Sequence, residues 1–236
     1  MKTITHYFRR SLMFLAILGL LFAGSVHASS VSDSLVKFSF DQEKSDMKIT
    51  GSSTVHDWTC DDIEKDGFIG VPESAIVQDQ LTLSSLQKAL QNNQSETPVT
   101  HLTVPVKKMH CEKSGMDPKM YKALKAKKHP TIEYKLNHVD VQSNKNSKKS
   151  SKKSPLTIST KGSLTIAGVQ RNISMPLSVT ISGDSTITVS GKKGLKMSSY
   201  NIEKPTAMWG TIQAYDDVTV HFQMVARTSH SSNGGQ

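Results

Sequence analysis

The sequence predicts an all-β protein, built as an antiparallel sandwich or barrel of about eight strands with one or two short helices. Apolar and polar residues alternate along many short segments, which places every second side chain on one face of a strand. Tight turns separate these segments, and only two stretches of the chain have helical spacing. A closed barrel of about eight strands has room inside for side chains or for one apolar ligand.

The clearest strand lies near the end of the chain, where polar residues alternate with Val218, Val220, Phe222, Met224 and Ala226. A period of two in hydrophobicity predicts a strand with one buried face. The same period predicts further strands at residues 173–181, 156–166, 132–136 and 104–106.

Three local features modify this strand pattern. Gly162 lies within an apolar stripe and predicts a bend there. Pro176 cannot donate a backbone hydrogen bond, so its strand is expected to be an edge strand or to be bulged at this position. The short apolar stripes at residues 38–40 and 47–49 predict a hairpin between these two segments.

Two short helices are expected between the strands. Asp117 is suited to cap the N-terminus of one helix, and Pro118 suits the first helical position. Pro130 ends this helix. Leucines at helical spacing predict the other helix across residues 83–92, followed by a loop over residues 92–98.

The N-terminus has the layout of a signal peptide. Lys2, Arg9 and Arg10 precede the apolar run Leu12–Gly24, and Val26-His27-Ala28 provides a small-residue cleavage site. This run would span roughly 20 Å, which is short of a hydrocarbon core of about 30 Å. We therefore expect residues 1–28 to be removed near Ala28 and the protein to be periplasmic or secreted. Residues 29–228 form the predicted domain, and residues 229–236 form a polar tail.

The formal charge of +9 does not describe the predicted domain. Removal of the signal peptide leaves 26 Lys and Arg against 20 Asp and Glu, which is +6. Five of these cations lie in the segment Ser143–Ser154, between Lys145 and Lys153. This segment contains only Ser, Asn and Lys, and it predicts a disordered loop. A transient contact of Lys145–Lys153 with an anionic membrane surface is the alternative. Nucleic acid is not an expected partner, because the run lacks stacking aromatic residues.

The chain has two cysteines, Cys60 and Cys111. An exported protein meets an oxidising compartment, so the pair predicts one disulfide bond. The alternative is a metal site formed by His56, Cys60, His110 and Cys111. If residues 110 and 111 lie on a strand, their side chains point to opposite faces and cannot both reach one ion. The disulfide is therefore the favoured prediction, and no metal site is expected.

The sequence offers little support for catalysis. It lacks the Gly-x-Ser-x-Gly motif of serine hydrolases, the His-Glu-x-x-His motif of zinc proteases, and a glycine-rich phosphate loop. His56 and Asp57 are neighbours, but adjacent residues on a strand point to opposite faces. A pair of carboxylates brought together by the fold stays open, because the sequence does not define such distances. We expect no enzyme activity and no cofactor.

Methionine is abundant for a β protein, with residues Met109, Met116, Met120, Met175, Met197, Met208 and Met224 in the strand and helix regions. Methionine side chains adapt to irregular apolar shapes, so they suit a lumen that holds a long, flexible hydrocarbon. Ordinary core packing is the alternative for each of these side chains.

Four stretches, in order along residues 36–227, resemble the YceI-like family of exported polyisoprenoid-binding proteins. These stretches are Gly51–Trp58, Met116–Pro130 with Ile132 and Tyr134, Gly162–Val169, and Lys204–Ile212 with Asp217–Phe222. The resemblance implies a lipocalin-like antiparallel barrel with a helix beside its mouth, a long isoprenoid or similar lipid in the lumen, and no known catalytic residues. Within the matched stretches, it implies these lumen residues: Trp58, Tyr134, Leu136, Leu164, Ile166, Met197, Met208, Phe222 and Met224.

The leading hypothesis is a non-enzymatic exported protein that holds an isoprenoid or isoprenoid-quinone lipid, as a carrier or sequestering protein. The second hypothesis is a structural or stress-response barrel whose lumen is packed with side chains and binds no ligand. A third hypothesis is an enzyme that uses His56 or a buried carboxylate. The expected partner is an apolar lipid, and the protein is expected to be a monomer or a homodimer.

Overall fold

The computed structural model describes residues 35–92, 99–141, 154–183 and 185–228. The predicted signal peptide at residues 1–28, the Lys/Ser segment up to residue 153, the loop at residues 93–98 and the tail at residues 229–236 lie outside the described residues. Within the described part of the chain, no helix is both long enough and apolar enough to cross a membrane.

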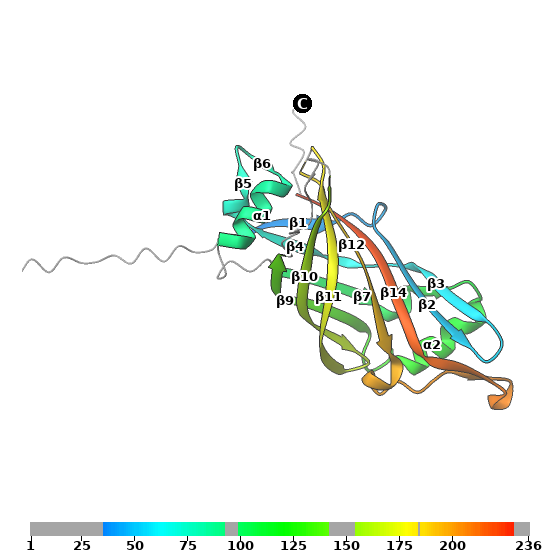
Figure 1. Ribbon diagram of the computed structural model, residues 1–236. Coiled ribbons are helices and arrows are strands. Elements are labelled where there is room, and N and C mark those ends of the chain that lie inside the picture. The colour runs from blue at the N-terminus through cyan, green and yellow to red at the C-terminus, as the bar shows by residue number, and fades with distance from the viewer. Residues whose placement is uncertain (1–34, 93–98, 142–153, 184, 229–236) are drawn as a thin grey trace, which may run out of the picture. The chain divides into compact units, whose positions relative to one another are not determined.

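Eight antiparallel strands form a closed barrel, which confirms the predicted fold class (Figure 1). Each strand pairs with the next, and the last strand pairs with the first. In order around the barrel these strands are β1 (Leu35–Phe40), β4 (Asp66–Pro72), β7 (Val99–Pro105), β9 (Thr131–Val141), β10 (Leu156–Ile166), β11 (Val169–Ile181), β12 (Ile187–Lys196) and β14 (Ile212–Thr228).

Three of these strands are continued by a second segment. The continuing segments are β2 (Asp46–Ser53) after β1, β3 (Asp57–Ile63) before β4, and β8 (Met109–Cys111) after β7. Strand β14 pairs with β1 at residues 226–228 and with β2 at residues 214–223. The pairing order at this end is therefore β14, β2, β3 and β8.

The predicted hairpin between residues 38–40 and 47–49 is wrong, because β1 and β2 run in the same direction along β14. Ser45 explains the break between them. Its buried hydroxyl accepts a hydrogen bond from the Val225 N–H at 2.9 Å, and Asp41 N–H donates to the Val225 carbonyl at 2.8 Å. These contacts satisfy the backbone of β14 where the ladder is interrupted. The hairpin partner of β2 is β3.

Helix α1 (Leu83–Asn92) has the predicted bounds and packs over one end of the barrel. Thr82 caps this helix, since its hydroxyl accepts from Ser85 N–H at 3.1 Å and the Ser85 hydroxyl accepts from Thr82 N–H at 3.1 Å. Leu86 and Ala89 are buried on the same face of the helix, in a core cluster with residues of the barrel wall. A 3-10 turn, η1 (Glu73–Ala75), and the short strands β5 (Ile76–Val77) and β6 (Gln80–Leu81) precede the helix.

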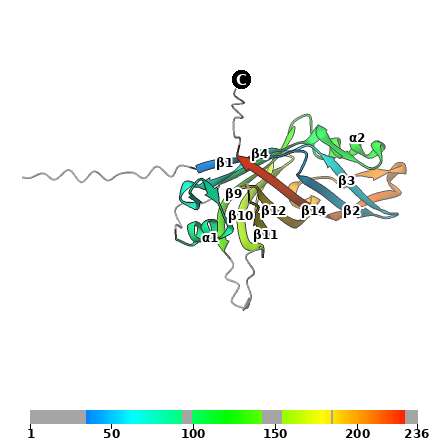
Figure 2. The same ribbon diagram turned by 90° about the horizontal axis from the view of Figure 1, so that it is seen from above.

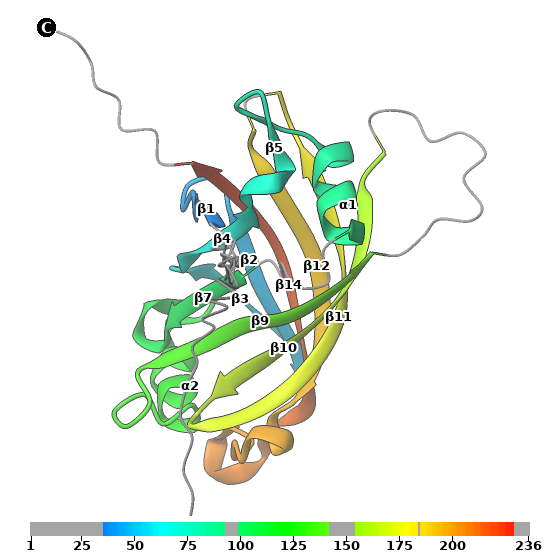
Figure 3. The same ribbon diagram turned by 90° about the vertical axis from the view of Figure 1, so that its left-hand side faces the viewer.

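Helix α2 (Asp117–Ala123) lies at the opposite end of the barrel, beside β8 (Figure 3). Pro118 occupies the first turn as predicted, but Asp117 does not cap the helix. Its carboxylate instead accepts hydrogen bonds from Cys111 N–H at 2.9 Å and lies 2.8 Å from His110 Nδ1. Asp117 therefore ties the helix to β8. The turns η2 (Val106–Lys108) and η3 (Ser114–Met116) lead into this region.

The barrel wall has a seam between β11 and β12. These strands pair only at residues 177–181 and 187–191, so their remaining parts diverge. Lys193 Nζ crosses the seam and donates to the Ser174 carbonyl at 2.9 Å. Pro176 lies at the point where pairing stops, so β11 is not an edge strand but its edge toward β12 is unpaired there. The 3-10 turn η4 (Met197–Tyr200) follows β12, and Arg171 Nε reaches its Ser199 carbonyl at 2.9 Å.

The bend predicted at Gly162 is present, because the pairing of β9 with β10 shifts register between Lys161 and Gly162. The last connection is formed by β13 (Thr206–Ala207) and the turn η5 (Met208–Gly210), which lead into β14. Figure 2 shows this connection, the β2–β3 hairpin and α2 at the same end of the barrel.

Candidate functional site

The barrel encloses a cavity of about 500 Å³. All eight barrel strands contribute to its wall, together with β2, β3, β8 and both helices. A volume of this size lies within the range of roughly 300–1,000 Å³ that is typical of small-molecule sites. The cavity extends from Leu86 and Leu90 of α1 to residues of β2, β3 and β13 at the other end.

The cavity wall is almost entirely apolar because the inward positions of each strand follow the period of two. On β9, for example, Ile132, Tyr134 and Leu136 line the cavity, while Glu133 and Lys135 pair with each other on the outside at 3.4 Å. Seven methionines are part of the lining: Met47, Met109, Met116, Met120, Met175, Met197 and Met224. Their flexible side chains give the wall a shape that can adapt to a ligand.

Glycines in the wall create space for large side chains to lie flat against it. A Cβ atom at Gly162 would lie 2.6 Å from the Tyr134 Oη and Cε2 atoms. A Cβ atom at Gly51 would collide with the indole of Trp58, its direct partner across β2 and β3. A Cβ atom at Gly191 would likewise lie 2.9 Å from the ring of Phe222. The rings therefore occupy the places of missing side chains instead of filling the lumen.

Tyr134 brings a polar atom into this apolar wall. The residue is only 8% exposed, and its hydroxyl has no hydrogen-bond partner among the described residues. The neighbouring Thr160 hydroxyl donates to the Met175 carbonyl at 2.9 Å. Burial raises the pKa of Tyr134, so the hydroxyl stays neutral at physiological pH. It is available to a ligand that carries a polar group at this depth.

The mouth of the cavity is identified by the lining residues that are exposed, and these are His56, Lys113, Lys119 and Thr206. They come from the β2–β3 turn, the segment around α2, and β13. All other lining residues are buried or half-buried. Lys113 Nζ lies 3.3 Å from His56 Nε2, so polar side chains surround the opening.

Cys60 and Cys111 form a disulfide bond, as predicted. The two residues are directly opposite each other on β3 and β8, and both line the cavity. The disulfide excludes the alternative in which His56, Cys60, His110 and Cys111 bind a metal, because bonded sulfurs are not thiolate ligands. Among the described residues, no group of three or more His, Cys, Asp or Glu side chains is arranged to hold a metal.

His56 also lacks the geometry of a catalytic base. Its Nδ1 atom is 3.4 Å from Ser53 Oγ, but that hydroxyl donates to the His56 carbonyl at 2.8 Å. Its Nε2 atom faces Lys113 and not a carboxylate. A nucleophile, a base and a residue that orients the base are therefore not brought together here.

Eight of the nine residues predicted for the lumen line the cavity: Trp58, Tyr134, Leu136, Leu164, Ile166, Met197, Phe222 and Met224. Met208 does not, and it is 66% exposed. The family resemblance implied a place for it in the lumen, but residues 208–210 form a 3-10 turn and not a strand. Whether the eight lining residues contact a ligand remains a prediction.

Much of the lining lies outside the set of residues predicted from the sequence. Val218 and Val220 belong to the same stripe as Phe222 and could have been included from their period alone. Leu86 and Leu90 could not, because only the fold places α1 over the end of the cavity. Gly51 and Gly191 carry no sequence signal of the rings that lie over them.

Comparison with known proteins agrees with this geometry. The family model described as YceI-like domain matches residues 32–226. The crystal structure of BcnA from Burkholderia cenocepacia is 17% identical, with a TM-score of 0.55 over 79% of this chain and 99% of BcnA. A polyisoprenoid binding domain from Saccharophagus degradans, implicated in plant cell wall breakdown, is 13% identical, with a TM-score of 0.57 over 82% of this chain and 99% of that domain. The chain shares their fold. No curated protein matches it.

Proposed function

The chain belongs to the YceI-like domain family, and from this premise we propose that it binds one long apolar lipid, of the isoprenoid or isoprenoid-quinone type, in its barrel cavity. The observation that carries the proposal is the enclosed, almost wholly apolar cavity of about 500 Å³. The polyisoprenoid binding domain from Saccharophagus degradans has the same fold, which supports this class of ligand.

The form of the cavity favours a linear hydrocarbon. Its lining extends from α1 to the mouth at His56 and Thr206, and the rings of Trp58 and Tyr134 lie along the wall. Each methylene transferred from water to such a site contributes about 0.8 kcal/mol. Roughly ten buried carbons therefore supply about 8 kcal/mol, which is the scale of micromolar binding before the cost of ordering the ligand.

The Tyr134 hydroxyl favours a lipid with a polar group at this depth, and a quinone carbonyl or an alcohol can fill this role. Inside an apolar site a hydrogen bond to an otherwise unpaired donor contributes about 1 kcal/mol. A purely hydrocarbon ligand leaves the hydroxyl unpaired and should bind less tightly. The quinone type of isoprenoid is therefore the ligand that the wall suits better.

A ligand also explains why the lumen is not filled by side chains. Apolar side chains that line a lumen without a ligand lack packing partners across it and face water through the mouth, both of which are unfavourable. A bound lipid restores the missing contacts. This reasoning favours the lipid-binding function over a purely structural barrel.

We further propose that the protein is exported after removal of residues 1–28 and that it carries or sequesters its lipid outside the cytosol without chemical change. The Cys60–Cys111 disulfide supports this location, because such bonds persist in oxidising compartments. An apolar lipid cannot cross water between membranes unaided, and an enclosed cavity shields it from water.

Mass spectrometry of the organic extract of the purified protein tests the binding function. The expected result is one long-chain isoprenoid or isoprenoid quinone per protein molecule. The intact mass of the same sample shows whether residues 1–28 have been removed. Absence of any co-purified lipid, together with failure of a fluorescent prenyl analogue to bind, would contradict the lipid-binding function and favour the structural barrel.

A further inference from the structure

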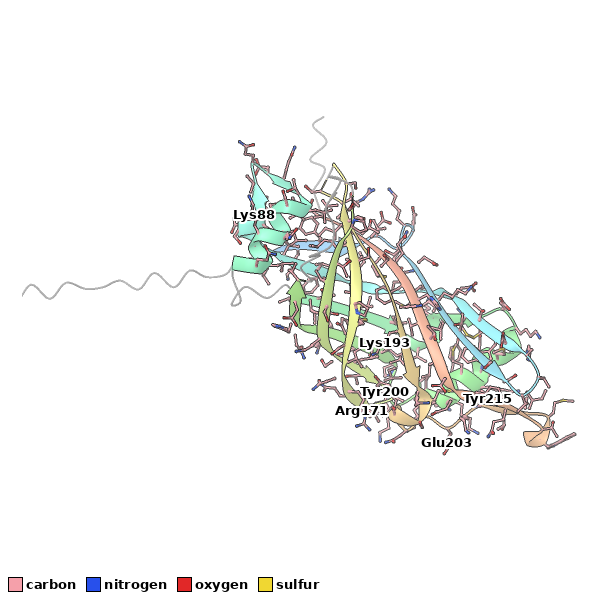
Figure 4. All side chains as sticks on the ribbon, viewed as in Figure 1. Lys88, Arg171, Lys193, Tyr200, Glu203 and Tyr215 are labelled. Carbon is pink, nitrogen blue, oxygen red and sulfur yellow. A yellow bond between two sulfur atoms is a disulfide. The ribbon has the colours of Figure 1, made fainter. Side chains whose placement is uncertain are left out.

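Exposed apolar side chains concentrate around the mouth of the cavity. Among the described residues, the large hydrophobic side chains that are exposed are Val55, Val77, Val99, Met208, Trp209 and Tyr215. Val55 precedes His56 of the mouth, and Met208 and Trp209 follow Thr206 of the mouth. Tyr215 lies on β14 at the same end of the barrel (Figure 4). Trp209 is fully exposed, at 104%.

The backbone holds two of these side chains outward. Met208 and Trp209 have φ angles of 50° and 54°, in the left-handed region that L residues with side chains disfavour. The Thr211 hydroxyl stabilises this turn by donating to the Met208 carbonyl at 2.8 Å. A strained turn that exposes a methionine and a tryptophan to water has no benefit for the isolated protein.

The turn is also attached to the β2–β3 hairpin. Thr54 N–H donates to the Gln213 carbonyl at 3.0 Å, and Gln213 N–H donates to the Thr54 hydroxyl at 3.2 Å. Val55 is therefore held close to the base of the η5 turn. We name Val55, Met208 and Trp209 the apolar tip.

Positive charge lies at the same end of the barrel. Residues 107–129, which contain α2, carry eight lysines against Glu112 and Asp117, and Lys108 pairs with Glu64 at 2.9 Å, so five positive charges remain in excess. Two of these lysines, Lys113 and Lys119, line the mouth. Lysines beside an apolar tip are complementary to anionic phosphates above a hydrocarbon layer.

From these features we propose that the mouth of the barrel docks on a lipid bilayer with anionic head groups, with Met208 and Trp209 inserted at the interface. Tryptophan is the residue that prefers this interface. A narrow, convex tip can enter a fluid bilayer, whereas a stable protein interface needs roughly 800 Å² of complementary surface on each partner. Docking would allow lipid to pass between the bilayer and the cavity, and this role rests on the proposed function. The proposal that the mouth binds a bilayer is independent of the proposed function.

Vesicle binding tests this surface. The full chain is expressed and purified, and its intact mass defines the N-terminus that every variant shares. Two vesicle types are compared: phosphatidylcholine alone, and phosphatidylcholine with about one third phosphatidylglycerol. The variant Met208→Ser/Trp209→Ser is compared with Val77→Ser, which removes a 56% exposed valine on β5 at the α1 end. We expect the double variant to lower the affinity for anionic vesicles about tenfold, and Val77→Ser to leave it unchanged.

Tryptophan fluorescence locates the contact. The chain has two tryptophans, Trp58 and Trp209, so the difference between the protein and its Trp209→Phe variant isolates Trp209. We expect anionic vesicles to shift the Trp209 emission to shorter wavelength, and brominated lipids to quench it. Lys119→Gln with Lys122→Gln should weaken binding severalfold, while Lys88→Gln on α1, at the opposite end in Figure 4, should not.

The inference is overturned if the Trp209 emission is unchanged by both vesicle types, or if Val77→Ser weakens binding as much as the double variant. It is also overturned if Trp209 becomes buried with rising protein concentration and no vesicles, which would identify a second copy of the chain as the occupant. A soluble prenyl analogue separates the two proposals. If the protein binds the prenyl analogue but not the vesicles, the docking proposal is contradicted and the proposed function is not. If it binds the vesicles but not the analogue, the proposed function is contradicted and the docking proposal is not.

Discussion

The ring of Tyr134 on β9 occupies the place of the side chain that Gly162 on β10 lacks. A Cβ atom at residue 162 would lie 2.6 Å from the Oη and Cε2 atoms of the ring. The two strands are neighbours, and their register shifts immediately before Gly162. The bulge and the glycine together let an aromatic side chain lie along the wall of the cavity.

Replacement of Gly162 by Ala should destabilise the protein by about 1–3 kcal/mol, because the added methyl group collides with the Tyr134 ring and with the Lys135 carbonyl oxygen. Urea unfolding measures this change. Gly194→Ala is the matched control, since a Cβ atom there meets nothing within 4 Å. Addition of Tyr134→Leu should remove the part of the Gly162→Ala penalty that is due to the ring, while the contact with the Lys135 carbonyl oxygen at 2.6 Å remains. If the two substitutions are additive, the ring is not the cause.

Replacement of Tyr134 by Phe should raise the stability of the ligand-free protein by about 1 kcal/mol, because it removes a buried hydroxyl that has no partner. The same substitution at Tyr121 should lower stability by about 1 kcal/mol, since the Tyr121 hydroxyl donates to the Met109 carbonyl at 2.8 Å. Urea unfolding of both variants checks the opposite signs. Equal losses in the two variants would show that the Tyr134 hydroxyl is bonded in solution.

The disulfide should contribute a large part of the free energy of unfolding. Cys60 and Cys111 are separated by 51 residues, and a loop of this length corresponds to about 4 kcal/mol on the chain-entropy model. Cys60→Ser with Cys111→Ser should lower the unfolding free energy by about this amount. A reducing agent should lower the stability of the natural chain but not that of the double variant. A response of the variant to the reductant would contradict the assignment.

Leu164→Trp should fill part of the cavity and weaken binding of a prenyl analogue at least tenfold, because Leu164 is a lining residue. Thr165→Trp is the control, since the next residue on a strand points away from the lumen. Fluorescence titration measures both affinities, and circular dichroism shows that both variants keep the fold. Unchanged affinity in Leu164→Trp would place the ligand elsewhere.

The buried tyrosines should make the free energy of unfolding fall at alkaline pH. Burial raises the pKa of Tyr134 and Tyr200 above the ordinary value of about 10. Above pH 10 the unfolded chain therefore loses these protons while the folded protein keeps them. Stability is complete below this pH and falls as the pH rises above it. Urea unfolding between about pH 9 and pH 11 should show a smaller loss in Tyr134→Phe and Tyr200→Phe than in the natural chain. An equal loss of stability in the variants and the natural chain would show that these two tyrosines do not cause the alkaline loss.

Much of the barrel was predictable because apolar and polar residues alternate along its strands. The stripe from Val218 to Ala226 faces the interior throughout β14, and the leucines of residues 83–92 define α1. The disulfide was predictable from the even number of cysteines and from the export that the N-terminus predicts. In each of these cases, neighbouring residues in the sequence carry the information.

The remaining features depend on partners that are distant in the sequence. Ser45 breaks the first strand by bonding to Val225, which is 180 residues away. The sequence suggests that Asp117 caps a helix. Its actual role as an acceptor for the Cys111 N–H is evident only once β8 is known to lie beside it. The resemblance implied that Met208 lies in the lumen, and it does not show that this residue is part of a turn. The mouth combines His56, Lys113 and Thr206 from three separate segments.

Strand β14 has a consequence for the time course of folding. It supplies the pairing of β12, β13, β2 and β1, and it is the last strand of the described chain to be synthesised. Until it emerges, those strands have unpaired edges and the barrel cannot close. Contacts of such high separation in sequence make folding slow. The barrel of the described chain therefore closes only when its last strand is complete.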